Sequence, residues 1–347
     1  MEHQPLEVQT LYAELLERLA AHEAGRSIGH AAGSFVLKTV KGSDYYYFQH
    51  SVPGGDKRQT YIGRRDTALD AVARRHAEAR DDIATDQASI ERLAALLRAG
   101  GALVTDTPSG RVLRALADAG VFALGGVLVG THAFAVLGNV LGVRWTGALR
   151  TQDIDLAVER TLGIALADMD ADVPTVLESL EMGFLPVPGL DPSNPSTSYK
   201  VRGHGLRVDL LTPSARQSSR PVPLRRFATA AQPLRFLDYL IESPIRAAAI
   251  DGGAVGVSVP APARFALHKL VVAAERPAVM HAKREKDLSQ AAQLLEVLLA
   301  ERPGDVALAV DALRSAGSAL TKRASASVRA LARTAPAIAK AMEPYEF

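Results

Sequence analysis

The stretch VFALGGVLVGTHAFAVLGNVLGVRWTGALRTQDIDLAV, residues 121–158, decides the fold. Its apolar first part, which ends at Val129, predicts a strand in a buried core. Gly130-Thr131 then permits a close backbone turn into a helix, and a second strand follows with Asp153 and Asp155. We expect the chain to be built to present these two carboxylates.

The two aspartates indicate a particular chemistry. Residues two apart on a strand face the same way, so Asp153 and Asp155 lie together while their neighbours enter the core. Two carboxylates on one face repel each other unless a cation lies between them. Asp209 supplies a third acid on an otherwise apolar strand, which is costly unless that acid is paired or bound to metal. Hard oxygen ligands of this kind suit Mg²⁺.

A membrane span is an alternative for the first part of this stretch. Residues 121–143 contain no charged side chain, and this length could cross a bilayer. Five glycines, Thr131-His132 and the carboxylate strand just beyond favour a buried core of helices and strands instead. We therefore expect no membrane partner.

Composition narrows the class of protein. The 347 residues allow two or three domains, and a net charge of +2 creates no global field that demands nucleic acid. The chain has no cysteine, which excludes disulfides, thiolate catalysis and zinc–cysteine sites. The first ten residues show no secretory pattern, so we expect a cytoplasmic protein.

Before the core, the sequence predicts an N-terminal helix, a small β meander and a long second helix. Leucines at four-residue spacing indicate the first helix, and turns rich in glycine separate the strands. Asp66 is the expected N-cap of the long helix, and Gly100-Gly101 ends it. The expected elements are a helix at 6–22, strands at 33–38, 45–52 and 59–62, and a helix at 66–98.

The meander mixes basic and aromatic side chains. Such a mixture could hold a phosphate backbone and stack bases, and the candidates are Lys57, Arg58 and Tyr46. The alternative is a sheet whose tyrosines pack on the next helix and whose lysines are solvated. The composition alone leaves both open.

The second half of the chain predicts the strand of Asp209 and then a helical tail. An acid-free loop at 214–226 leaves that strand; it contains Arg216 and Arg220 and could hold triphosphate or RNA, or be a solvated loop. The other expected elements are a helix at 173–182, a surface loop at 185–198, a hairpin at 199–211, strands at 245–250 and 254–259, and helices from 260 onward.

The order of these motifs resembles the DNA polymerase β-like nucleotidyltransferase superfamily. Its hallmark is a Gly-Ser turn after a strand, then a helix, an Asp-x-Asp strand and a third acid on a later strand. The resemblance implies an α+β fold whose core is a mixed sheet with flanking helices. We expect an N-terminal helix, β meander and long helix at 1–110, the nucleotidyltransferase core at 111–259 and a C-terminal helical bundle at 260–347.

The helical tail is similar to that of some AbiEii-type toxins, at His268-Lys269-Leu270, Arg276 and Lys286-Asp287. The resemblance implies that Lys269, with Lys286 or Arg276, neutralises the leaving pyrophosphate. His132 and His268 lack metal-ligand spacing and are expected to pack or cap helices.

The resemblance also implies an activity. Gly130 and Thr131 would hold the phosphates of an NTP at the helix N-terminus, where Thr131 can also act as a cap. Asp153, Asp155 and Asp209 would bind two Mg²⁺ ions, and Asp209 would help to deprotonate an acceptor hydroxyl. We expect NMP transfer to RNA, with tRNA and a toxin role included, and an antitoxin partner. Protein or small-molecule nucleotidylation and non-catalytic nucleotide or RNA binding stay open; the sequence leaves the oligomeric state undetermined.

Two features depart from the superfamily pattern. The turn is Gly-Thr rather than Gly-Ser, which keeps a hydroxyl group. The separation of Thr131 from Asp153 is long, so residues 138–149 are expected to be an inserted loop. Gly125-Gly126 is the competing phosphate turn if the alignment at Gly130 is wrong.

Overall fold

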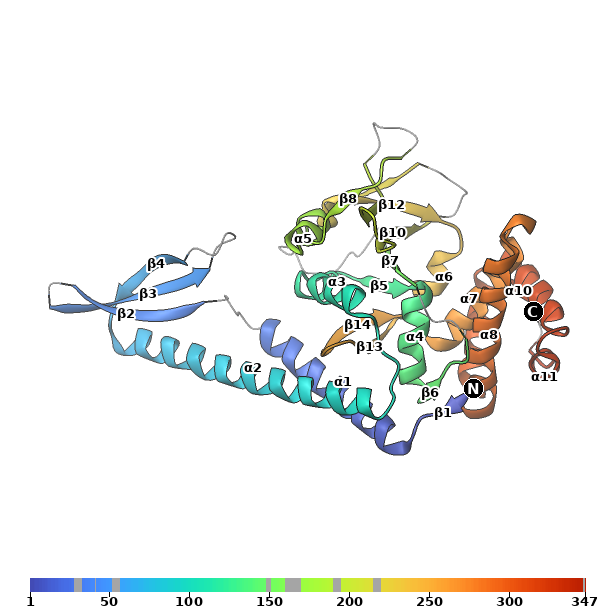
Figure 1. Cartoon of the computed structure of the whole chain (residues 1–347), viewed down its shortest axis with the longest axis horizontal. Coiled ribbons are helices and arrows are strands. Elements are labelled where there is room, and N and C mark those ends of the chain that lie inside the picture. Colours follow the sequence, from blue (N-terminus) through green and yellow to red (C-terminus); the bar gives the residue numbers. More distant parts are fainter. Residues whose placement is uncertain are drawn as a thin grey trace.

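The computed structural model describes residues 1–27, 33–40, 42–51, 57–147, 151–159, 170–189, 195–214, 220–345 and 347. Figure 1 shows a large sheet at the centre, a helical bundle on one side of it and a small three-stranded sheet at the opposite end. The expected α+β architecture is confirmed. Arg216, one of the predicted binding residues, lies outside the described residues.

The central sheet is mixed, as predicted. Along its main path the strand order is β11-β12-β10-β7-β5, in which β7, β10 and β12 run parallel, while β5 and β11 are antiparallel to their neighbours. A hairpin of β8 and β9 attaches to β10 through β9. The strands are β5 (Gly126–Val129), β7 (Asp153–Val158), β8 (Phe184–Pro186), β9 (Ser198–Val201), β10 (Arg207–Pro213), β11 (Val222–Leu224) and β12 (Thr229–Leu234).

The first strand is shorter than the sequence suggested. Residues 121–125 form turns, and Gly120 and Gly125 both have φ of +83°, a conformation that glycine adopts without a steric penalty. These residues are still largely buried, which explains the apolar run. The alternative phosphate turn at Gly125-Gly126 is wrong, because these residues precede β5 or begin it, whereas the helix follows its other end.

The expected inserted loop at 138–149 is also wrong for its described part. Helix α4 (Gly130–Val140) continues into it, and β6 (Val143–Arg144) then pairs with β1 (Glu2–His3). Trp145 is buried; its indole donates a hydrogen bond to the carbonyl of Phe134 at 2.6 Å, and the two rings stack at 4.7 Å. These contacts fix the segment against α4.

No helix among the described residues combines the length and the apolar character that crossing a bilayer requires. The uncharged stretch 121–143 instead divides into turns, β5, α4 and the start of β6. The sheet and the helices bury the apolar side chains of this stretch, so the protein interior takes the place that a lipid bilayer would have in the membrane alternative.

The N-terminal helices share a core with the middle of the chain. Helix α1 (Leu6–Ser27) and the end of α2 (Thr67–Ala99) pack on the hairpin of β13 (Ile245–Ile250) and β14 (Ala254–Val259). The Tyr12 hydroxyl, buried in this contact, accepts from the amide of Ala248 at 2.9 Å and donates to its carbonyl at 3.1 Å. The expected 1–110 unit therefore packs directly on strands of the expected 111–259 unit.

The meander forms as expected at the N-terminal end of α2, as Figure 1 shows at the far left. Strands β2 (Ser34–Val40), β3 (Ser43–Ser51) and β4 (Lys57–Arg64) make an antiparallel sheet in the order β2-β3-β4. Asp66 caps α2 by accepting a hydrogen bond from the amide of Leu69 at 2.8 Å.

The remaining helices cover the sheet and form the bundle. The predicted loop 185–198 contains part of β8. The predicted loop 214–226 contains β11, and β12 follows it. The sequence did not predict these two strands because their residues include prolines and little β-branching. The helices are α3 (Thr107–Asp118), α5 (Val173–Ser179), α6 (Leu237–Ile241), α7 (Pro262–Glu275), α8 (His281–Glu301), α9 (Pro303–Ser315), α10 (Ser318–Leu331) and α11 (Pro336–Ala341).

Candidate active site

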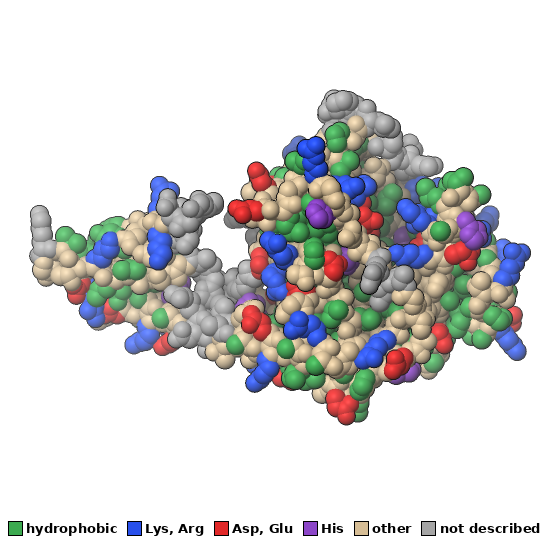
Figure 2. All heavy atoms as spheres, in the orientation of Figure 1, with side chains coloured by type: hydrophobic (Ala, Val, Ile, Leu, Met, Phe, Trp, Pro, Cys, Tyr) green, Lys and Arg blue, Asp and Glu red, His purple; other side chains and the backbone are tan. Residues whose placement is uncertain are grey.

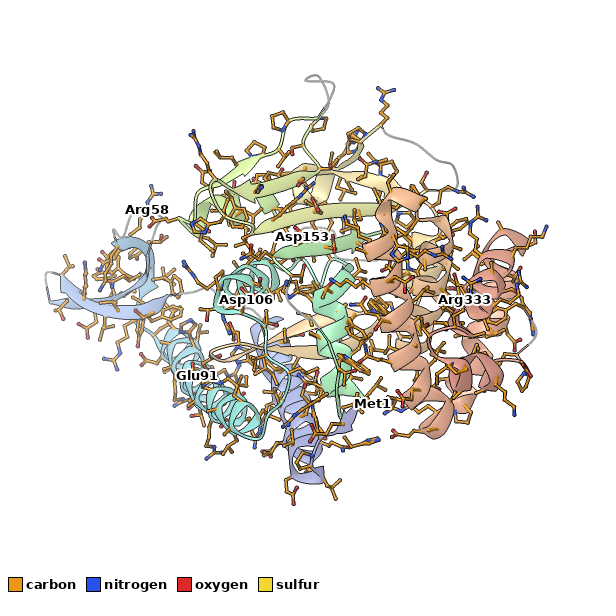
Figure 3. All side chains as sticks on the ribbon, turned by 45° about the vertical axis from the view of Figure 1, so that its right-hand side comes forward. Met1, Arg58, Glu91, Asp106, Asp153 and Arg333 are labelled. Carbon is orange, nitrogen blue, oxygen red and sulfur yellow. The ribbon has the colours of Figure 1, made fainter. Side chains whose placement is uncertain are left out.

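Strands β7 and β10 bring the predicted carboxylates together. In the parallel pairing, Asp209 is the register partner of Asp155, and Arg207 is the partner of Asp153. Side chains alternate along each strand between buried apolar residues and these more accessible polar ones, so all four polar side chains share one face. Figure 3 places Asp153 at the sheet in the middle of the molecule.

Asp155 shows the electrostatic cost of this arrangement. Burial, followed by the negative charges of Asp209 and Asp153, raises its pKa from 3.8 to about 7. Lys269 and Arg207 act in the opposite direction and do not offset these effects on the pKa. The cluster thus carries excess negative charge that a cation would stabilise.

Asp209 already has a cationic partner in the protein. The Nε of Arg207 donates to its Oδ1 at 2.7 Å and also to the Oγ of Ser198 at 2.7 Å. The ion pair is partly exposed, with 42% of the Arg207 side chain and 22% of the Asp209 side chain accessible. Arg207 was not predicted from the sequence, although its place two residues before Asp209 puts both on one face of the strand.

The residues at this face fit Mg²⁺ by their chemistry. Within the described ranges, Asp153 and Asp155 form no salt bridge, and their oxygens are the ligands that Mg²⁺ prefers. As the side chains stand, no set of three or more described His, Asp and Glu residues is arranged to hold a metal ion. A cation shared by all three aspartates must therefore compete with Arg207 for Asp209.

Gly130 brings the start of α4 against Asp155. Val129 pairs with Asp155 across β5 and β7, and Gly130 begins the helix immediately afterwards with φ of +70°. A Cβ atom at Gly130 would lie 2.1 Å from Oδ2 of Asp155. The turn therefore needs glycine both for its positive φ and because a Cβ atom would not fit. It also places the N–H groups of the first helical turn, which have no partner within the helix, beside the carboxylates.

Thr131 does not cap α4 as predicted, because the N-cap position is held by Val129, which makes no side-chain capping hydrogen bond, and Thr131 lies in the first turn. Its hydroxyl instead accepts a hydrogen bond from Nζ of Lys286 at 2.9 Å, which joins the first turn of α4 to α8. Burial and the charge of Lys269 lower the pKa of Lys286, whereas nearby acids that include Asp153 and Asp155 raise it. A predicted phosphate-binding lysine thus lies at the predicted glycine turn.

Asp287 organises the other two predicted cations. It is 3% exposed and accepts from Nζ of Lys269 at 2.9 Å and from Nε of Arg276 at 3.0 Å. A buried carboxylate with two cationic partners fixes α7, the segment after it and α8 together. Lys269 also acts on the pKa of Asp155, which places it within electrostatic reach of the site.

The two histidines are buried beside these groups. Burial lowers the pKa of His132 and lowers that of His268 to about 3, so both imidazoles are neutral near pH 7. Neither Nε2 atom has a hydrogen-bond partner among the described residues. This burial is consistent with the packing role expected from the sequence.

The predicted nucleic-acid residues lie elsewhere. Figure 3 shows Arg58 on the small sheet, apart from Asp153 on the large one. Lys57 and Arg58 are exposed, but Tyr46 packs against Phe35 and donates a hydrogen bond to Asp70 of α2 at 2.7 Å. Tyr46 therefore packs on the next helix, which is the alternative to base stacking that the sequence left open. Arg220 is exposed just before β11.

Comparison with known proteins identifies the family. A family model described as nucleotidyltransferase matches residues 107–315, more than half of the chain. The chain belongs to this nucleotidyltransferase family. The matched region contains the three aspartates, the glycine turn and the cations of α7 and α8.

Two other comparisons add less. The chain is similar to the crystal structure of an antigenic nucleotidyltransferase-like protein from Paracoccidioides brasiliensis, with 14% identity and a TM-score of 0.36. The similarity covers 68% of this chain and 93% of the other. A search of curated proteins finds no match.

Substitution Gly130→Ala tests the glycine turn. We expect it to lower stability by about 1–2 kcal/mol through the positive φ, and to abolish binding of Mg²⁺-NTP through displacement of Asp155. Gly183→Ala is the matched control, because Gly183 has φ of +79° and free space around its Cβ position. Thermal unfolding and calorimetric titration separate the two effects. Wild-type nucleotide affinity in Gly130→Ala would contradict the assigned role.

The raised pKa of Asp155 predicts a pH-dependent stability in EDTA. Because the folded-state pKa of about 7 exceeds the unfolded value of 3.8, the stabilising contribution is full below pH 3.8 and is lost as the pH rises through 7. Between pH 5.5 and 8 the loss is about 2 kcal/mol. Asp155→Asn should remove this dependence. Unfolding curves at both pH values check it, and parallel changes in variant and wild type would refute it.

Proposed function

We propose that this nucleotidyltransferase moves an NMP group from an NTP to a hydroxyl acceptor with Mg²⁺ as cofactor. The proposal rests on one observation: acidic groups that suit a metal ion and basic groups that suit phosphate both lie next to the turn at Gly130. Asp153, Asp155 and Asp209 form an acidic face beside Gly130, while Lys286 contacts the next residue, Thr131, in the first turn of α4. Such a division suits a metal-bound triphosphate.

Each residue has a separate task in this reaction. The N–H groups at the start of α4 and Lys286 bind phosphate oxygens, and Lys269 neutralises charge on the departing pyrophosphate. Asp153 and Asp155 would hold Mg²⁺, and Asp209 would share a second ion after its release from Arg207. Bound there, Mg²⁺ neutralises the triphosphate and makes the acceptor hydroxyl easier to ionise.

Asp209 and Asp287 complete the set. Asp209, the register partner of Asp155 on the neighbouring strand, would accept the proton of the acceptor hydroxyl. Asp287 touches no reacting atom in this scheme and acts as a positioning residue for Lys269 and Arg276. Arg276 therefore supports the charge near the pyrophosphate together with Lys269.

For the acceptor we propose RNA, with tRNA included. The exposed basic side chains of the small sheet, among them Lys57 and Arg64, support a nucleic-acid acceptor by their charge. A toxin role with an antitoxin partner, in the cytoplasm, is the extension that the similarity to AbiEii-type toxins suggests. Growth arrest on expression of the wild type, absent with Asp153→Asn, is the outcome that this extension requires.

The activity is tested with each of the four α-labelled NTPs, Mg²⁺ and total cellular RNA. We expect label to enter RNA, and expect Asp153→Asn to reduce transfer by at least 100-fold because it removes a metal ligand. Asp311→Asn is the matched control, since Asp311 is an exposed residue of α9 paired only at the surface with Arg314. It should retain wild-type activity.

The distribution of label decides between acceptors. Label in the protein alone would replace RNA by a protein acceptor, and release of pyrophosphate without labelled polymer would indicate a small molecule. Equal label with wild type and Asp153→Asn would contradict the proposed role of the acidic face. Binding of NTP without any turnover would assign the chain to non-catalytic nucleotide binding.

A further inference from the structure

The three-stranded sheet has two faces with different tasks. Figure 2 shows this sheet and the adjoining part of α2 as a lobe beside the main body, with basic, acidic and hydrophobic side chains on its surface. On one face Phe35 and Phe48 contact the ring of His76 from α2 at 5.4 and 5.5 Å. Tyr46, on the same face, binds Asp70 of α2. This inner face is therefore occupied by the chain itself.

The outer face carries three further tyrosines. Tyr47 is the register partner of Tyr61, and Tyr45 lies two residues before Tyr47 on β3, so all three rings project on the same side. The ring of Tyr61 lies 5.6 Å from that of Tyr47 and 6.1 Å from that of Tyr45. Tyr61 is 55% exposed. Among the described residues, the ring contacts of these three tyrosines are all to residues of the small sheet and none is to a helix.

Cations surround this aromatic surface. Nζ of Lys38 lies 5.0 Å from the centroid of the Tyr47 ring, and Arg64 is the register partner of Tyr45. Lys57 occupies the same face further along β4, since it follows the same alternation as Tyr61. The only acid of the three strands, Asp44, alternates to the inner face, where it pairs with Arg65. Among the strand residues, the charged side chains of the outer face are thus all basic.

Amide side chains complete the outer face. Gln49 and Gln59 are register partners, and Nε2 of Gln59 donates to Oε1 of Gln49 at 2.6 Å. Lys38 also donates to Gln59. The surface therefore offers ring faces for stacking, fixed positive charges and hydrogen-bonding groups within one small sheet.

We propose that the outer face, formed by Tyr45, Tyr47, Tyr61, Lys38, Arg64 and Lys57, binds single-stranded nucleic acid. Bases stack on the tyrosine rings, and the backbone phosphates lie against the basic side chains. Unpaired bases are required because a duplex hides its ring faces. Binding itself does not depend on nucleotidyl transfer, but delivery of an acceptor to the distant acidic face rests on the proposed function.

Fluorescence anisotropy of a labelled 12-nucleotide oligouridylate tests the stacking. We expect Tyr47→Ala/Tyr61→Ala to weaken binding by the full-length protein at least tenfold. An RNA duplex of the same length should bind more weakly than the single strand. Circular dichroism checks that the variant is folded. Undiminished affinity in the folded double variant would overturn the proposal.

The basic residues offer a test that leaves the rings intact. Arg64 and Arg58 lie on the same strand, are both exposed, and project from opposite faces. Arg64→Gln should reduce the slope of log affinity against log salt by about 0.7, whereas Arg58→Gln should leave it unchanged. An equal reduction of the salt slope in both variants would mean that arginines on either face of the sheet contribute equally to binding, which contradicts the proposed surface.

Two further experiments distinguish RNA binding by the outer face from nucleotidyl transfer and from binding of an acidic protein. RNA binding should persist in Asp153→Asn, so a failure of transfer and a failure of binding give different results. A polyglutamate peptide should not displace the oligouridylate at equal charge concentration. Displacement by the peptide would assign the face to an acidic protein partner and overturn the nucleic-acid proposal.

Discussion

The parallel register of β7 and β10 is the constraint on which the site depends. It sets Asp155 beside Asp209 and Asp153 beside Arg207, while the alternate residues of both strands fill the core. A shift by one residue would turn the acids inward and the apolar side chains outward, so burial of the core fixes the acidic face. The free energy gained by that burial offsets the cost of burying Asp155 beside two other acids, which its raised pKa records.

Cations from three elements offset part of the negative charge of these acids. Arg207 comes from β10, Lys269 from α7 and Lys286 from α8, and Asp287 holds Lys269 in place. In the proposed reaction, phosphate oxygens would replace Thr131 as the partner of Lys286, and Mg²⁺ would replace Arg207 as the partner of Asp209. In the resting protein, Arg207 and Thr131 thus occupy Asp209 and Lys286, which limits the cost of keeping these charged groups together.

Local patterns predicted the parts of the site, and tertiary packing decided how they meet. The alternation of side chains along a strand predicted that Asp153 and Asp155 share one face. The end of the apolar run at Val129 predicted the glycine turn at Gly130. The Lys286–Thr131 contact spans 155 positions of sequence, so no local pattern reveals it. The role of Asp287 depends on the crossing of α7 and α8. In the meander, composition did not distinguish Tyr46 from Tyr45 and Tyr47. Which tyrosine faces α2 depends on how the sheet lies against that helix, and the composition does not show this.

The most direct test of the central claim is a crystal structure with Mn²⁺ and an NTP analogue that cannot transfer its nucleotidyl group. The account predicts anomalous density for Mn²⁺ against the carboxylates of Asp153 and Asp155, with the phosphates at the start of α4 near Lys286. It also predicts that Asp209 has left Arg207 for the metal. Density for metal and nucleotide away from β7 and β10, or none at saturating concentrations, would contradict it.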